Sequence, residues 1–332
     1  MDSDLIHGGA LDVMRQKFKD APAPWIDLST GISPFPYPHT DISHAALQDL
    51  PTQAMVDSCR AAMAKTFCAS EESIVLAPGS ELLIRLLPRV INLKTVAVLT
   101  PSYGDHKQVW AAAGCDVIEA ADPLTYADDV DAVVVCNPNN PDGRVFSPNE
   151  LEAARSRLAA HGGWLIIDEA YADLEPRRSL ARSGGQEGLI ILRSLGKFYG
   201  LAGLRLGAAL MPPSVRTVMG EQLGTWPVAG PALEIGTRAY NDNDWSNGAR
   251  LQLAAARRRL DAILERCGVD ICGGTDLFRL IEVADAYRLW EVLAQHGIYV
   301  RRFDWSRAHL RIGLPTDEQA EMRLEHALSS SM

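Results

Sequence analysis

One lysine in this sequence stands in an apolar, glycine-rich segment, where lysines are uncommon. The segment is "RSLGKFYGLAGLRLG" at 193–207, and the neighbours of Lys197 are small or aromatic. Partial burial favours the neutral amine, and a neutral lysine is a nucleophile that can form a Schiff base with an aldehyde. The plainer alternative is a surface lysine that follows a strand. Lys197 is therefore a candidate for covalent catalysis.

A second candidate is Asp168, in the apolar run "WLIIDEA" at 164–170. A carboxylate at the end of a buried strand is costly unless a cation or a hydrogen-bond donor compensates it. A helix cap or a structural ion pair would do so, and so would a protonated ring nitrogen. Pyridoxal 5′-phosphate carries such a nitrogen, and an acid beside it lets the ring accept electrons from a substrate carbon.

Other residues have the chemistry to hold a phosphorylated ring. Gly79 and Ser80 open an expected helix, whose N-terminal amides can bind phosphate, although an ordinary serine cap is the alternative. Ser194 and Arg205 add a hydroxyl and a guanidinium fork that binds oxyanions. Tyr103, in "PSYG", can stack on a ring or only pack in the core.

All of these candidates lie near the ends of short apolar runs that alternate with amphipathic segments. The runs are at 73–77, 95–100, 131–136, 164–170, 188–194 and 205–211, with helices expected from 80 and near 104–113. This alternation predicts the α/β class, with a mostly parallel sheet of the seven-stranded type covered on both faces. Ligands of such sheets bind beyond the carboxyl ends of the strands, so we expect the turns there to meet.

The pattern changes after about residue 225. A long, once-broken helical stretch is followed by "LFRLIEV", "IYVRRF" and "HLRIGL", which alternate with two helices. We expect an N-terminal arm at 1–38 that packs on a small domain, and a large cofactor-binding domain at 39–225. An interdomain helix and the small α+β domain are expected at 226–332.

Composition restricts the class of partner. The chain has 332 residues, is 47% hydrophobic and carries a formal net charge of −10, which disfavours nucleic acid and anionic membranes as partners. Its six cysteines form no CxxC pair, so we expect no metal site and reduced, buried thiols. No signal peptide is readable, and no apolar run approaches the ~20 residues of a membrane helix. We therefore expect a soluble, cytoplasmic protein.

Together, these motifs resemble those of the fold-type I pyridoxal-phosphate enzymes, the class I/II aminotransferase superfamily. "NPNNPDG" at 137–143 is similar to the turn NPNNPTG, which implies that Asn140 bonds the phenolic oxygen of the cofactor. "DEAY" implies that Asp168 pairs with the ring nitrogen and that Tyr171 also reaches the phenolic oxygen. The implied catalytic residues are Lys197, Asp168 and Tyr171.

The same resemblance implies roles for the remaining candidates. Lys197 would carry the cofactor as a Schiff base, and Tyr103 would stack on its ring. The cofactor phosphate would be held by four residues: Gly79, Ser80, Ser194 and Arg205. Relatives in the superfamily have a large α/β domain and a small α+β domain, and they are homodimers with active sites at the subunit interface. We therefore expect a homodimer.

Two branches of the superfamily fit best: threonine-phosphate decarboxylases of cobalamin biosynthesis and histidinol-phosphate aminotransferases. The N-terminal "HGGALDVMRQKF" and the later "WIDLSTGISPFPYP" resemble the first branch and imply that His7 receives the substrate phosphate. "HLRIGL" implies that Arg311 holds the substrate α-carboxylate, with Arg301 near it. Gly31 stands where relatives use asparagine for the substrate phosphate.

Two further positions depart from the pattern of the superfamily. Leu50 precedes Pro51 where relatives have a tyrosine that crosses the dimer interface to the cofactor phosphate. Gly196 precedes the lysine where serine or threonine is usual. Both departures imply fewer contacts to the cofactor phosphate than in relatives.

The leading hypothesis is decarboxylation of O-phospho-L-threonine to aminopropanol phosphate. The first alternative is an aminotransferase that acts on histidinol phosphate or another amino acid. The second is a catalytically silent protein of the same fold that serves as a partner. Decarboxylation and transamination use every residue named above, so the motifs indicate the cofactor better than the reaction.

Overall fold

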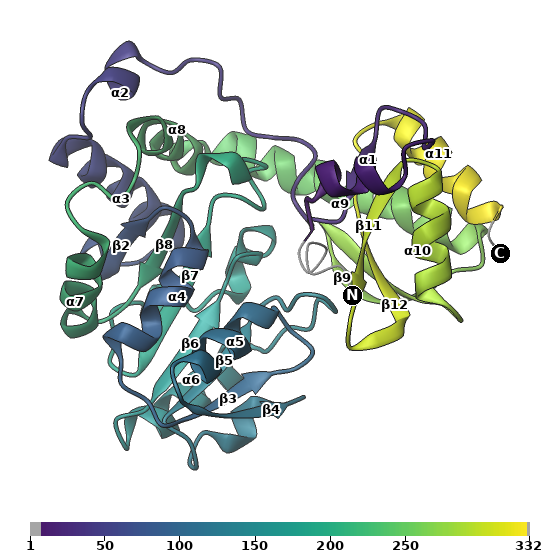
Figure 1. Ribbon diagram of the computed structural model, residues 1–332. Coiled ribbons are helices and arrows are strands. Elements are labelled where there is room, and N and C mark those ends of the chain that lie inside the picture. The colour runs from purple at the N-terminus through teal and green to yellow at the C-terminus, as the bar shows by residue number, and fades with distance from the viewer. Residues whose placement is uncertain (1–7, 331–332) are drawn as a thin grey trace. The chain divides into compact units, whose positions relative to one another are not determined.

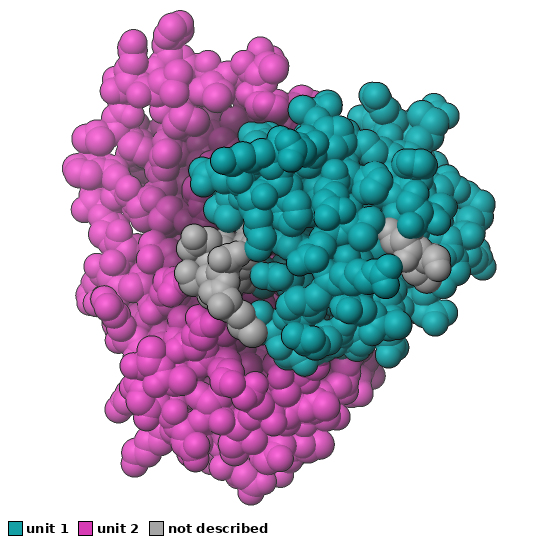
Figure 2. Space-filling view, turned by 45° about the vertical axis from the view of Figure 1, so that its right-hand side comes forward, with its two compact units in different colours: residues 1–35, 141–143, 247–332 teal, residues 36–140, 144–246 magenta. Residues whose placement is uncertain are grey.

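The computed structural model describes residues 8–330, so His7 lies outside the described residues. The chain divides into two compact units, coloured separately in Figure 2. Within the described residues, the larger unit comprises 36–140 and 144–246, and the smaller comprises 8–35, 141–143 and 247–330. Among the helices of the described chain, none combines the length and apolarity that crossing a membrane requires.

The larger unit is built on a seven-stranded sheet (Figure 1). Its strands lie in the order β2 (Ile74–Ala77), β8 (Gly207–Leu210), β7 (Leu189–Ser194), β6 (Trp164–Asp168), β5 (Ala132–Cys136), β3 (Thr95–Leu99) and β4 (Asp116–Ala120). β8 runs antiparallel to both of its neighbours, and all other pairs are parallel. The predicted α/β class with a mostly parallel sheet is confirmed. β4 was not predicted, because this edge strand is only partly buried and its sequence is not a continuous apolar run.

Helices cover both faces of this sheet (Figure 1). One face packs against α4 (Ser80–Val90), α5 (Gly104–Ala112) and α7 (Pro213–Leu223), whose buried apolar side chains form one cluster with those of the strands. The other face is covered by α3 (Gln53–Phe67), α6 (Pro148–Ala159) and α8 (Gly230–Asn241). A short helix, α2 (His44–Gln48), precedes α3.

The alternation of side chains along a strand places neighbouring residues of β6 and β7 on opposite faces of the sheet. Ile166 of β6 and Leu192 of β7 belong to the cluster under α4 and α5. Asp168 and Ser194, two residues further along each strand, therefore face the same side. Their neighbours Glu169 and Arg193 face the opposite side, where Arg193 lies 4.2 Å from the ring centre of Phe67 in α3.

The smaller unit has a five-stranded sheet in the order β1 (Ile26–Leu28), β11 (Ile298–Phe303), β12 (Ser306–Gly313), β10 (Phe278–Glu282) and β9 (Asp270–Thr275). β1 pairs in parallel with β11, and the other pairs are antiparallel. Its helices are α1 (Leu11–Lys17), most of α9 (Asn243–Arg266), α10 (Ala286–Gln295) and α11 (Glu318–Ser329). β1 and β9 were not predicted: β1 has three residues, and β9 contains two consecutive glycines.

The expectation of six buried thiols is wrong. All six cysteines are free, but only Cys59 and Cys136 are buried, and Cys68 and Cys272 are exposed. Cys68 ends α3 with a left-handed backbone, which places it at the surface after the last helical turn.

The ends of β6 and β7 are joined by a buried ion cluster. Arg193 Nη1 lies 2.8 Å from Glu169 Oε2, and its other terminal nitrogen pairs with Asp173; all three side chains are almost completely buried. The Leu180 amide also donates to Glu169, at 2.9 Å. Burial raises the pKa of Glu169, while the Arg193 charge opposes that rise.

We expect Arg193→Met to destabilise the protein strongly, because it leaves two buried carboxylates without their cation. Loss of one partner of a buried pair costs about 3–5 kcal/mol. The matched control is Arg178→Met, which breaks an exposed pair with Glu175 and is expected to cost about 0–1 kcal/mol. Urea unfolding followed by circular dichroism measures both; equal shifts in the unfolding midpoint would contradict this account.

Candidate active site

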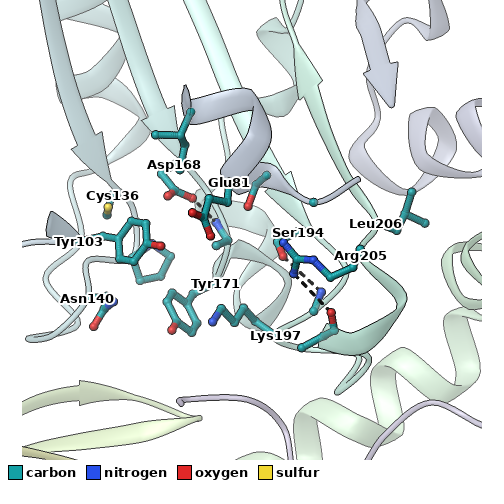
Figure 3. Close-up of a pocket in the computed structure, with 17 residues that line it drawn as sticks. Glu81, Tyr103, Cys136, Asn140, Asp168, Tyr171, Ser194, Lys197, Arg205 and Leu206 are labelled. Carbon is teal, nitrogen blue, oxygen red and sulfur yellow. Dashed lines mark hydrogen bonds between the residues drawn. The ribbon is translucent and has the colours of Figure 1, made fainter. Parts of the chain in front are cut away.

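One pocket of the larger unit is lined by all nine residues that the sequence associates with the cofactor (Figure 3). These are Gly79, Ser80, Tyr103, Asn140, Asp168, Tyr171, Ser194, Lys197 and Arg205. They come from the N-terminus of α4, the turn before α5, the turn after β5, the ends of β6 and β7, and the segment that joins β7 to β8. Parallel strands bring these turns together at one sheet edge, so residues up to 126 positions apart share a cavity.

Figure 3 shows how the labelled side chains are arranged around Lys197. The Lys197 amine points toward Tyr171 and lies 5.9 Å from the centre of its ring. Ser194 and Arg205 lie together on one side of the pocket, and Tyr103 and Asn140 lie on the other. The pocket therefore presents an amine between an anion-binding end and a polar, aromatic end.

The carboxylate of Asp168 is buried, and both of its oxygens are oriented. Oδ1 accepts a hydrogen bond from the Ala170 amide at 3.1 Å, and Oδ2 lies 3.0 Å from His106 Nε2. A carboxylate has about four lone-pair sites, so Asp168 can still accept a bond from a third donor, such as a protonated ring nitrogen. This is the environment that a pyridinium requires.

His106, the partner of Asp168, was not singled out from the sequence. Burial lowers its pKa, but the neighbouring Cys136 sulfur and hydrogen bonds to Asp168 and Cys136 raise it to about 10. The imidazole is therefore protonated at neutral pH and compensates the buried carboxylate. The feature of the sequence that could have identified His106 is its position three residues after Tyr103. This spacing places both side chains on the same side of the first turn of α5.

The ring of Tyr103 is held in a defined orientation. Its hydroxyl donates to Asp105 Oδ2 at 2.9 Å, and its ring packs edge-on against His106 with centres 5.9 Å apart. Burial raises the pKa of Tyr103, and the charge of Asp105 raises it further, so the phenol stays neutral. Tyr103 is thus suited to stack on a planar ligand that lies above Asp168.

The anion-binding end has space only because two glycines lack a Cβ atom. A Cβ at Gly79, where φ is 91°, would lie 2.6 Å from Arg205 Nη2. A Cβ at Gly207 would lie 2.4 Å from the backbone nitrogen of Ser80, the first residue of α4. The guanidinium, the Ser80 amide and the nearby Ser194 hydroxyl therefore form a close-packed set of donors that fits a phosphate.

Among the described residues predicted to bind the substrate, none lines this pocket. Arg301 and Arg311 belong to the smaller unit, as does Gly31, which is buried with φ 61°. Arg301 of β11 and Arg311 of β12 are direct partners in the antiparallel ladder, so their side chains emerge on the same face. That face of the small sheet therefore carries two guanidinium groups that a bound anion can contact.

Arg311 is anchored within its own unit. It is buried, its Nη2 donates to the carbonyl of Ser29, and its guanidinium carbon lies 5.1 Å from the ring centre of Phe278. These contacts fix the plane of the guanidinium, as bidentate recognition of a carboxylate requires.

We expect Gly207→Ala to weaken binding of pyridoxal 5′-phosphate, because the added methyl group displaces the Ser80 amide. A charge-assisted hydrogen bond contributes about 1.5–3 kcal/mol, so the dissociation constant should rise at least about tenfold. The matched control is Gly203→Ala, since a Cβ at Gly203 meets no atom within 4 Å. Absorbance titration measures both affinities, and equal affinities would refute the geometry of the cradle.

The chain matches the family described as aminotransferase class I and II over residues 25–326. It is 41% identical to a threonine-phosphate decarboxylase of Pseudomonas aeruginosa over 98% of this chain and 97% of that protein. It is 38% identical to a threonine-phosphate decarboxylase of Sinorhizobium sp over 99% of both chains.

Among solved structures, it resembles histidinol-phosphate aminotransferase from Sinorhizobium meliloti in complex with pyridoxal-5′-phosphate. The TM-score is 0.85 at 19% identity, with 96% of this chain and 93% of that chain covered, which shows a shared fold. The family match spans both units, and the sheet order and pocket agree with the resemblance inferred from the motifs. The chain belongs to the class I and II aminotransferase family.

Proposed function

We propose that this chain catalyses the pyridoxal-phosphate-dependent decarboxylation of O-phospho-L-threonine to (R)-1-aminopropan-2-yl phosphate in cobalamin biosynthesis. The single observation that carries the choice of reaction is the similarity to two threonine-phosphate decarboxylases, at 41% and 38% identity, over almost the full length of each chain. The nine residues gathered in one pocket support the choice of cofactor.

Different residues of the pocket are assigned to different parts of the cofactor. Lys197 would supply the amine that links to its aldehyde carbon, Asp168 would accept from its ring nitrogen, and Tyr103 would stack on its ring. Asn140 and Tyr171 would hold its phenolic oxygen. The cofactor phosphate is assigned to the donors at Gly79, Ser80, Ser194 and Arg205.

When bound, pyridoxal phosphate supplies an electron sink for the pair of electrons released at the substrate Cα. The residues of the chain decide which bond is broken, because only a bond held perpendicular to the ring plane overlaps with its π electrons. We assign this orientation to Arg311 and Arg301, which would hold the substrate's anionic groups. Carbon dioxide would leave, and Lys197 or water would supply the proton that takes its place on Cα, so the products are the amine and CO₂.

Arg311 and Arg301 suit a substrate that carries both a carboxylate and a phosphate. Their cross-strand pairing places two positive charges on one face of the small sheet. A dianionic phosphate together with a carboxylate supplies enough negative charge to balance both. His7, also predicted to bind the substrate phosphate, lies outside the described residues, and its role stays a prediction. The homodimer and the cytoplasmic location likewise stay predictions.

The reaction is tested by its stoichiometry. With O-phospho-L-threonine and no keto acid, we expect one CO₂ and one aminopropanol phosphate for each substrate consumed. Lys197→Ala should lower the rate by at least about 10²–10⁴-fold and remove the absorbance of lysine-bound cofactor. The control Lys107→Ala, at an exposed lysine paired with Glu119, should change neither. An absolute requirement for a keto acid would instead identify an aminotransferase, and no turnover of any amino acid or its phosphate would indicate a silent protein.

The role of Arg311 is tested by Arg311→Lys, which keeps the charge but loses the planar fork. We expect KM for O-phospho-L-threonine to rise by about tenfold or more, while affinity for the cofactor is unchanged. The control is Arg302→Lys, since Arg302 points to the opposite face of β11 and packs 4.5 Å from the ring centre of Trp290. If KM is the same in Arg311→Lys as in the unmodified chain, Arg311 does not hold the substrate.

A further inference from the structure

Three potential metal ligands meet at the inner end of the pocket. They are His106 of α5, Cys136 of β5 and Asp168 of β6, all buried, and one ligand atom of each lies within 4.8 Å of the other two. The sheet places them together, because Cys136 and Asp168 are register partners on adjacent strands and face the side that α5 covers. Successive ligands are about 30 residues apart in the sequence, so no short spacing motif indicates the cluster.

The donor set selects a class of cation. An imidazole nitrogen, a thiolate sulfur and a carboxylate oxygen suit Zn²⁺ and the similar Cd²⁺, whereas Mg²⁺ and Ca²⁺ prefer oxygen alone. In a tetrahedral zinc site with bonds near 2.0–2.1 Å, neighbouring nitrogen and oxygen ligands are roughly 3.3 Å apart. His106 Nε2 and Asp168 Oδ2 are 3.0 Å apart, so a small increase in this distance makes room for the ion.

The surroundings of the cluster also fit such an ion. Ser102 Oγ lies 3.2 Å from Cys136 Sγ, where its hydroxyl can donate to a metal-bound thiolate. A divalent cation with one thiolate and one carboxylate is neutral overall, which suits a buried site. Cys136 and Asp168 both line the pocket (Figure 3), so the fourth coordination position opens into it.

We propose that the chain without its cofactor binds one Zn²⁺ through His106, Cys136 and Asp168, and that Zn²⁺ and pyridoxal phosphate exclude each other. The ion replaces the proton between His106 Nε2 and Asp168 Oδ2, and the thiol releases its own proton as the Cys136–metal bond forms. The ion and its fourth ligand then occupy the part of the pocket beside Asp168 that the ring nitrogen would need. The exclusion, but not the metal site itself, rests on the proposed function.

The metal site is tested on the full chain after removal of the cofactor, with Cd²⁺ as the probe. We expect one tightly bound Cd²⁺ per chain and a thiolate-to-cadmium absorbance band. Cys136→Ser should abolish the band, and His106→Asn should weaken binding by at least about tenfold. Cys272→Ser is the matched control, because Cys272 is exposed and outside the cluster. A band that persists in Cys136→Ser overturns the site.

The exclusion is tested with Zn²⁺ and pyridoxal phosphate together. Linkage requires each ligand to weaken the other, so prior saturation with Zn²⁺ should slow cofactor loading and prior loading should remove the Cd²⁺ band. In Cys136→Ser, the rate of loading should be the same with and without Zn²⁺. A cofactor-loaded chain that still binds Cd²⁺ with the same band overturns the exclusion. Failure to bind cofactor at all would refute the proposed function but leave the metal test intact.

Discussion

The pocket depends on a carboxyl group that is buried at the end of an apolar strand. Asp168 ends a strand whose other residues are apolar, and it would be costly there without compensation. The Ala170 amide and the His106 imidazolium supply that compensation, and each fixes one oxygen. Three features of the structure depend on the Asp168 carboxyl group. They are the position of α5 over the sheet, the conformation of the turn after β6 and the orientation of Tyr103 beside His106.

The opposite face of the sheet carries a second charged cluster with a different task. Glu169 and Arg193 follow and precede the pocket residues Asp168 and Ser194, and their side chains point the other way. Their ion pair joins β6 to β7 at the point where both strands lead into the pocket. The ion pair therefore holds the two strand ends together from the face of the sheet opposite the pocket. The side chains that face the pocket need no direct contact with each other to stay in place.

The sequence predicted the parts of the molecule in which local pattern and tertiary structure agree. Most strands of the large sheet read as continuous apolar runs because they are buried on both faces, and the nine residues that the motifs proposed for the cofactor do share one pocket. β1 and β9 were missed because they are short or glycine-rich, and their pairing depends on partners distant in sequence. His106 and Cys136 were missed for a related reason. What distinguishes them is their position beside Asp168 in the folded chain, and neither stands in a distinctive local motif.

The anchoring of Arg311 has a consequence for how the small sheet forms. Its Nη2 donates to the carbonyl of Ser29, which follows β1 and lies 282 positions earlier in the sequence. Bringing such distant segments together costs entropy before the contact stabilises them, so contacts of this kind slow folding. The fixed guanidinium of Arg311 therefore depends on the closure of a long loop.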